Sequence, residues 1–273
     1  MNSNVDVTAP WELKSNAALS FIFEPGQRPS ADDVLRLVQS SGGRAWEKLG
    51  GDEWLGKNQA TGFAISHKPE PSAGWLEILA GGLTFDLAGL TPAPSAPLPE
   101  MAHWYGFREK PRVEVAEAIT LVPGEHLQGA ENLLPVTRVM TATATRLAAL
   151  DNVKAVVWHP ARSAMAPAVF TTSIGNWLQG GAFPALGLTA LFPDGNGAIR
   201  SEGLAFFIGQ ELLIEPSIGI STAQNVKIAA RLINHLVGSN TIQQRFDFIG
   251  PNGEYLSVEP SGNDRFLRVW TKS

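Results

Sequence analysis

Four prolines within ten residues constrain this chain more than any other feature. The segment TPAPSAPLPE (91–100) has proline at positions 92, 94, 97 and 99. Proline fixes the backbone φ angle and lacks an N–H donor, so such a segment favours an extended path over a helix or a central strand. We therefore predict a Pro-rich linker over residues 91–110. It divides the chain into an amino-terminal module (15–90) and a larger carboxy-terminal domain (111–273).

The amino-terminal module alternates short apolar runs with one amphipathic segment. Residues 17–23 form an apolar run suited to a buried strand. Ser30 can cap a helix that carries Asp32 and Asp33 in its first turn and ends at Gly42-Gly43. Residues 61–66 and 75–85 are two further predicted strands, the second bent or bulged at Gly81-Gly82. The order is β-α-β-β.

The carboxy-terminal domain repeats this pattern at greater length. Its best helix signal is Ser221 with Gln224 three residues later, a capping box ahead of an apolar face. The turn PDGNG (193–197) predicts a hairpin, because Gly and Asn tolerate positive φ. We predict strands over 113–122, 154–158, 186–192, 198–208 and 211–215, helices over 135–150, 167–179 and 222–237, and short strands over 246–270.

These patterns predict an α+β fold with mixed or antiparallel sheets and helices packed on one face. Both halves have a strand–helix–strands order, which leaves open two similar α+β modules that arose by duplication. No residue-level repeat supports a duplication.

Composition narrows the classes of partner. The net charge is −5, and one glutamate interrupts the only compact basic cluster, Arg108-Glu109-Lys110-Pro111-Arg112. We therefore expect no nucleic-acid partner and no attraction to anionic lipids. The chain has no cysteine, no secretory signal at its amino terminus and no apolar stretch that could span a bilayer. We expect no membrane partner and a cytoplasmic location.

No intact cofactor or metal motif is present. Residues 51–58 (GDEWLGKN) match the frame of a phosphate-binding loop, but the adjacent acids would repel phosphate and no helix start follows. We interpret this segment as a surface turn. The five histidines show no metal-ligand spacing. We therefore expect no cofactor and no metal.

Two residues are weak catalytic candidates. His159 lies in Trp158-His159-Pro160 at the carboxyl end of a predicted strand, the usual side for sites in α/β sheets. The same three residues also end a strand, because the residue before a proline avoids helical geometry. Glu211 lies between Gly209 and an apolar run, where it either serves as an acid or base or accepts backbone N–H bonds. The sequence does not show whether the two residues converge.

The stretch EGLAFFIGQEL (202–212) carries a family resemblance. A Gly-Leu pair, a few apolar residues and then Gly-x-Glu, followed by a helix and final strands, resembles the carboxy-terminal part of an uncharacterised bacterial family named domain of unknown function four-two-six-one. Trp158-His159-Pro160 also looks like a turn found in that family. The resemblance covers residues 186–270 and implies a fold, without catalytic residues to transfer.

We predict a non-catalytic bacterial accessory module, of the immunity type by analogy, that binds another protein or a second copy of itself. The absence of an intact catalytic motif, the 17% charged fraction and the eight tryptophans motivate this prediction. One alternative is a hydrolase-like enzyme that uses His159 and Glu211. Another is a small-ligand sensor with a pocket between the two modules, which requires an apolar hollow with a few polar groups.

Overall fold

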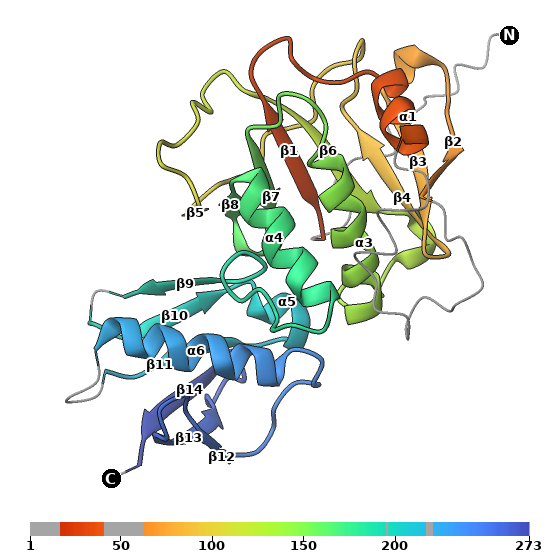
Figure 1. Cartoon of the computed structure of the whole chain (residues 1–273). Helices are drawn as coiled ribbons and strands as arrows, with labels where there is room; N and C mark the ends of the chain where they lie inside the picture. The colour runs from red at the N-terminus through yellow and green to blue at the C-terminus, as the bar shows by residue number, and fades with distance from the viewer. Residues whose placement is uncertain (1–16, 41–62, 195, 217–220, 273) are drawn as a thin grey trace, which may run out of the picture.

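A computed structural model describes residues 17–40, 63–194, 196–216 and 221–272. The phosphate-loop-like segment 51–58 lies outside these residues. Within them the chain forms two lobes, each with its own sheet and its own helices, stacked one above the other in Figure 1. The α+β prediction is confirmed: both sheets are mostly antiparallel and each contains one parallel pair.

The first lobe contains an eight-stranded sheet in the order β2-β3-β4-β6-β1-β7-β8-β5. Its strands are β1 (Leu19–Phe23), β2 (Ala64–His67), β3 (Trp75–Ala80), β4 (Leu83–Ala88), β5 (His103–Tyr105), β6 (Glu117–Pro123), β7 (Ala155–Trp158) and β8 (Ser163–Met165). Its helices α1 (Ala31–Ser40), α3 (Leu134–Leu147) and α4 (Pro167–Leu178) lie together, with α3 against β3 and β4 and α4 against β7. Short 3-10 turns cover Pro71–Ala73, Glu125–Leu127 and His159–Ala161.

The second lobe contains a six-stranded sheet in the order β12-β13-β14-β11-β10-β9. Its strands are β9 (Ala190–Pro193), β10 (Ile199–Glu202), β11 (Glu211–Ile214), β12 (Phe246–Ile249), β13 (Tyr255–Pro260) and β14 (Phe266–Thr271). The long helix α6 (Thr222–Leu236) packs on one face, and the short helix α5 (Leu204–Ile208) joins β10 to β11. Ser221 caps α6 as predicted, because its side chain accepts the N–H of Gln224.

The Pro-rich segment does not separate two sheets. Strands from before and after residues 91–110 belong to one sheet, and the change of sheet falls between β8 and β9. Arg28 anchors the segment by donating to the carbonyl oxygens of Gly89 and Ala93. Ala96 donates its N–H to the carbonyl of Ala118 on β6 at 3.0 Å. The prolines thus give the extended path that the sequence predicts, but this path is packed on the sheet.

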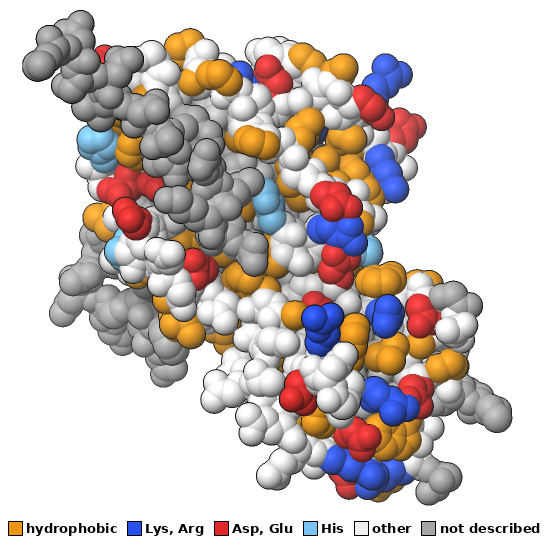
Figure 2. Space-filling view, turned by 180° about the vertical axis from the view of Figure 1, so that it is seen from behind, with side chains coloured by type: hydrophobic (Ala, Val, Ile, Leu, Met, Phe, Trp, Pro, Cys, Tyr) orange, Lys and Arg blue, Asp and Glu red, His pale blue; other side chains and the backbone are white. Residues whose placement is uncertain are grey.

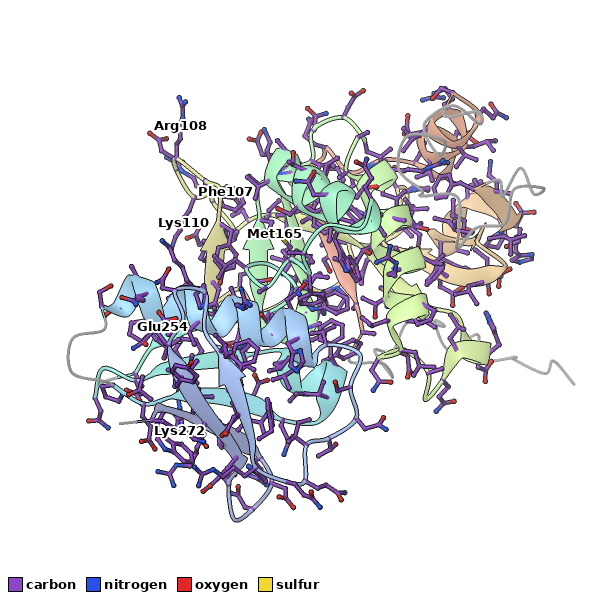
Figure 3. The ribbon with its side chains drawn as sticks, turned by 60° about the horizontal axis from the view of Figure 1, so that its bottom comes forward. Phe107, Arg108, Lys110, Met165, Glu254 and Lys272 are labelled. Atoms are coloured by element: carbon purple, nitrogen blue, oxygen red, sulfur yellow. The ribbon has the colours of Figure 1, made fainter. Side chains whose placement is uncertain are left out.

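The residues that follow the four prolines pack on a second, smaller core. Met101 and Phe107 contact a buried apolar group on the sheet, formed by Ile22, Ala118, Ala155, Val157 and Ala164. The basic cluster follows immediately, on a loop that extends from the edge of the first lobe (Figure 3). Lys110 lies over the Trp104 ring at 5.3 Å, and Arg108 points away from the body of the protein.

Two predicted strands differ from the structure. Residues 75–85 form the two strands of the β3–β4 hairpin, because both Gly81 and Gly82 take positive φ and reverse the chain instead of bending one strand. Residues 198–208 begin as β10 but continue as α5, because Gly203 takes a φ of 91° and the backbone leaves the sheet there. The two lobes differ in strand number and order, and neither coincides with the predicted modules 15–90 and 111–273.

Candidate functional site

His159 is the first residue of the 3-10 turn that follows β7. Its side chain is hydrogen-bonded to the first sheet. Its Nε2 lies 2.8 Å from the Ser20 hydroxyl, which in turn lies 2.7 Å from the Thr120 hydroxyl. Burial lowers the pKa of His159 to about 4, so the ring is neutral at ordinary pH. A neutral imidazole next to a serine hydroxyl has the geometry of a base and a nucleophile. Ser20 is 0% exposed, however, so no substrate can reach it.

Glu211 is the first residue of β11, and its carboxylate accepts hydrogen bonds from the start of α5. Oε1 accepts the backbone N–H groups of Gly203 and Ala205 at 2.8 and 3.0 Å. Oε2 accepts the N–H of Leu204 and the hydroxyl of Ser201. Burial raises the pKa of Glu211, although these four donors act to lower it. The carboxylate therefore shapes the β10–α5 turn and has no free lone pair directed at a substrate.

His159 and Glu211 belong to separate hydrogen-bond groups. The partners of His159 are on β1, whereas those of Glu211 are on β10 and α5. The turns that carry these groups pack closely, since a Cβ at Gly203 would lie 2.7 Å from the Cβ of Ala161. Among the described residues, His159 and Glu211 therefore share no hydrogen-bond partner, and their convergence on one site stays a prediction.

A charged cluster joins the two lobes close to these turns. Arg162 donates from Nη2 to Glu202 Oε2 at 3.0 Å and also bonds Glu202 through Nε and Glu100 through Nη1. His103 Nε2 lies 2.7 Å from Glu202 Oε2, and its ring stacks on Phe192. Arg162 adopts φ 45°, a left-handed conformation that is uncommon outside glycine. We call these four residues (Glu100, His103, Arg162, Glu202) the interlobe clamp.

A pair of carboxylates on the first sheet was not singled out from the sequence. Glu77 and Asp86 lie directly opposite each other on β3 and β4. Burial, together with the negative charges of Glu77 and Glu125, raises the pKa of Asp86 to about 6, although His126 acts to lower it. Predicting a hairpin over residues 75–88, in place of one bent strand, would have revealed this pairing, since the register follows from the Gly81-Gly82 turn. Among the residues that the structure describes, no group of three acids or histidines is placed to hold a metal ion.

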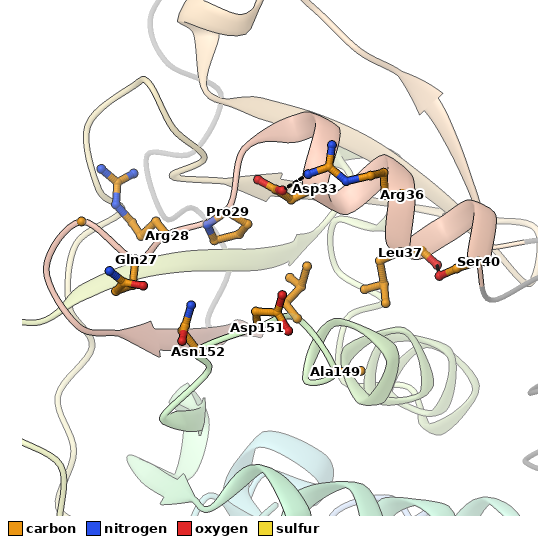
Figure 4. A pocket seen from close by; sticks show the side chains of 12 residues that line it. Gln27, Arg28, Pro29, Asp33, Arg36, Leu37, Ser40, Ala149, Asp151 and Asn152 are labelled. Carbon is orange, nitrogen blue, oxygen red and sulfur yellow. Dashed lines mark hydrogen bonds and ion pairs between the residues drawn. The ribbon is translucent and has the colours of Figure 1, made fainter.

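A polar hollow of about 530 Å³ lies beside α1, between the turn at residues 26–29 and the turn at residues 149–152 (Figure 4). Most of its charged side chains already have partners. Arg36 pairs with Asp33, and Arg28 pairs with Glu117 at 3.1 Å. Gln27 and Asn152 project between the two turns. Among the described residues that line it, the hollow therefore offers amide groups and Asp151 but no unpaired cation.

The face of the second sheet opposite α6 carries a distinctive mixture of side chains. Alternate side chains on β11 and β14 point toward α6 and join the main core, for example Leu212 and Val269. The side chains between them point the other way. The register places these outward residues on one face, which we call the open face: Arg200, Leu213, Asp247, Ile249, Tyr255, Glu259, Phe266, Arg268 and Trp270.

Aromatic and cationic side chains meet on the open face. Arg200 lies over the Phe266 ring at 5.0 Å, and Arg245 lies over the Trp270 ring at 5.2 Å. Tyr255 and Ile249 are opposite each other in register and are 69% and 55% exposed. Figure 2 shows this side of the second lobe, where apolar side chains lie among both positive and negative ones. Apolar residues on both faces of the segment FLRVWT (266–271) were the sequence signal for this surface.

Comparison of the chain with protein-family models, with curated proteins and with solved structures finds no match. The resemblance to domain of unknown function four-two-six-one therefore stays a prediction. The pattern that carries it now has a described geometry, because Gly203, Gly209 and Glu211 together form the α5 turn. In the described residues, no helix combines the length and apolar character that crossing a bilayer requires.

Proposed function

We propose that this protein is a non-catalytic binding module that docks another protein on the open face. One observation carries the proposal: within the part of the chain that the structure describes, five apolar side chains on one sheet face belong to neither buried core (Leu213, Ile249, Tyr255, Phe266 and Trp270). An antiparallel sheet with one solvated face normally carries polar residues there. Tryptophan, tyrosine and arginine are the residue types enriched at interface hot spots.

The charges of the open face favour a protein partner over a nucleic acid. Arg268 pairs with Glu215, and Lys272 pairs with Asp247 at 2.6 Å, so neither sign dominates. A phosphate backbone needs a continuous positive surface, whereas a protein surface can match alternating charges. We place this activity in the cytoplasm of a bacterium, as part of the same proposal.

The test combines two exposed substitutions, Ile249→Asp and Tyr255→Asp. Both side chains are more than half exposed, so the fold should tolerate the change while the apolar patch gains two charges. The full chain is used as bait in a lysate of the host, and captured proteins are quantified by mass spectrometry. We expect a partner whose recovery falls at least about tenfold with the double variant, since hot-spot losses reach 2 kcal/mol or more.

Val115→Asp is the matched control, because Val115 is 66% exposed but lies in the first lobe. It should leave partner recovery unchanged. Sedimentation of the purified wild type and double variant distinguishes a foreign partner from a second copy of the chain. A monomeric wild type that captures nothing sensitive to the two substitutions would contradict the proposal.

A further inference from the structure

A second hollow, of about 450 Å³, lies between the two lobes. One wall is the start of α3 in the first lobe. The opposite walls are α5 and the turn that follows α6 in the second lobe. Its described lining residues are Asn132, Leu133, Leu134, Pro135, Ala205, Phe207, Ile208, Gly209, Gly238, Ser239, Asn240 and Thr241. The hollow therefore collects three segments that are far apart in the sequence.

Hydrogen bonds at both ends of α5 hold this wall of the hollow in place. Glu211 accepts three N–H groups at the start of α5, and the Thr241 hydroxyl donates to the Ile208 carbonyl at its end at 3.0 Å. Gly209 takes a φ of 80°, which turns the chain back into β11. As a result, one turn of helix is fixed from both ends, with Phe207 and Ile208 toward the hollow. A wall fixed in this way is preformed before any ligand arrives.

The lining is uncharged and combines apolar with polar side chains. None of the described lining residues is an acid, a base or a histidine. Leu134, Phe207 and Ile208 form an apolar base, and Leu133 lies at the rim with 54% of its surface exposed. The side chains of Asn132, Ser239 and Asn240 are exposed and have no hydrogen-bond partner among the described residues. A volume of this size falls in the range of small-molecule sites, roughly 300–1,000 Å³.

We propose that this interlobe hollow binds an uncharged small molecule that has an apolar body and hydroxyl or amide groups. Burying a charged group against these walls without a counter-charge would be costly, which excludes ions as ligands. The apolar body would cover Leu133 and Phe207, and the polar edge would bond the asparagine and serine side chains at the rim. Because the hollow has walls from both lobes, the bound molecule would also hold the lobes together and stabilise the folded chain.

Ala205→Trp tests the proposal, because Ala205 is exposed on α5 and a large side chain there would fill the hollow. Ala223→Trp is the matched control on the first turn of α6, where Ala223 is also exposed and lies outside the hollow. The probe is Nile red, an uncharged apolar dye whose emission rises and shifts to the blue in apolar sites. We expect saturable binding to the wild type and to Ala223→Trp, weakened at least about tenfold in Ala205→Trp.

Ser239→Trp fills the hollow from the opposite wall and guards against a folding defect in the first variant. Thermal melts establish that each variant is folded. Equal Nile red binding by the wild type and both filled variants, or no saturable binding by the folded wild type, would overturn the proposal. The Ile249→Asp/Tyr255→Asp variant keeps the hollow intact and should bind the dye normally, so failure here and failure of the open-face proposal are distinguishable.

Discussion

At the scale of single residues, His159 illustrates how a reactive-looking side chain can be structural. The imidazole accepts or donates one bond to Ser20, and Ser20 bonds Thr120, so three neighbouring strands (β6, β1 and β7) share one polar chain. Buried polar groups need such partners, because an unpaired one costs about 1–3 kcal/mol. These hydrogen bonds explain why a histidine is tolerated at this position. Burial keeps its imidazole neutral.

The lowered pKa of His159 makes a pH prediction. The folded-state pKa is about 4, below the ordinary value of 6.5, so the unfolded chain binds an additional proton between these two values. This contribution to the free energy of unfolding is complete above pH 6.5 and is lost as the pH falls toward 4, by on the order of 2–3 kcal/mol.

His159→Gln removes the titrating group. Urea unfolding from pH 7 to pH 4.5 should show a shallower decline in stability for His159→Gln than for the wild type. His235→Gln, an exposed control on α6, should retain the wild-type slope. Identical slopes for all three proteins would show that His159 is not buried as described. Asp86, whose raised pKa acts in the opposite direction over an overlapping pH range, is present in all three proteins and cancels in the comparison.

At the scale of elements, locally encoded structure is the part that the sequence predicts well. The amphipathic helices and the caps at Ser30 and Ser221 depend on neighbours three or four residues away, and they form where predicted. Residues 204–208 (LAFFI) are apolar at every position and fit a buried strand equally well. The structure forms a helix here because the carboxylate of Glu211, on the neighbouring strand β11, accepts the N–H groups at the start of α5. The periodicity of the sequence does not reveal this contact.

The Pro-rich segment shows the same limit. Its prolines predict an extended path, but its attachment to the sheet depends on Arg28, more than sixty residues earlier in the chain. A guanidinium that pairs with Glu117 and two carbonyls is a long-range contact, and no local pattern marks it. The same reasoning applies to the candidate sites: FLRVWT indicates a two-faced strand, whereas the interlobe hollow depends on how the lobes pack.

Gly203 and Gly197 provide a paired prediction about the α5 turn. Both take left-handed φ values, 91° and 83°, so alanine is strained at both positions. A Cβ at Gly197 would meet nothing within 4 Å, whereas a Cβ at Gly203 would lie 2.7 Å from Ala161 Cβ and 2.9 Å from its Cα. Gly203→Ala should therefore lower the free energy of unfolding by about 1–3 kcal/mol more than Gly197→Ala. This difference is the typical cost of overpacking a close contact, roughly 1–3 kcal/mol.

Chemical denaturation of the two alanine variants measures this difference directly. Equal losses would mean that backbone strain alone limits both positions, and that α5 is not packed on the His159–Ala161 turn. A larger loss for Gly203→Ala would show that this turn positions the wall of the interlobe hollow.

At the scale of the whole molecule, the two lobes share one core. A single cluster of buried apolar residues runs from β1 and α3 of the first lobe to α6 and β14 of the second. Trp158 of β7 is fully buried against Phe206 and Phe207 of α5, so aromatic packing crosses the boundary between the lobes. The exposed Ile249 and Tyr255 of the open face lie on β12 and β13, at the end of the second sheet opposite the β9–β10 edge that contacts the first lobe. A partner could therefore dock there without separating the lobes.

A substitution in the interlobe clamp tests whether the two lobes unfold as one unit. Burial alone would raise the pKa of Glu202, but the bonds from Arg162 and His103 outweigh burial and lower it. The clamp therefore contributes stability above the unfolded carboxyl pKa, about 4.5, and loses it as the pH falls further. Glu202→Gln removes this charge while retaining a similar shape. We expect the free energy of unfolding at pH 7 to fall by about 1–2 kcal/mol, a modest value because Arg162 is partly exposed to solvent.

Unfolding of Glu202→Gln should remain a single transition, followed together by far-ultraviolet circular dichroism and by tryptophan fluorescence. Glu259→Gln, on the open face, is the control and should leave the midpoint almost unchanged. If the two signals separate in Glu202→Gln, the lobes unfold independently once the clamp is lost, and the shared core is too weak to couple them. If they coincide, apolar packing around Trp158 couples the lobes, and the clamp adds stability without being required for that coupling. That outcome is the one we expect, because Trp158 at the centre of the aromatic contact is fully buried whereas the clamp is partly exposed to solvent.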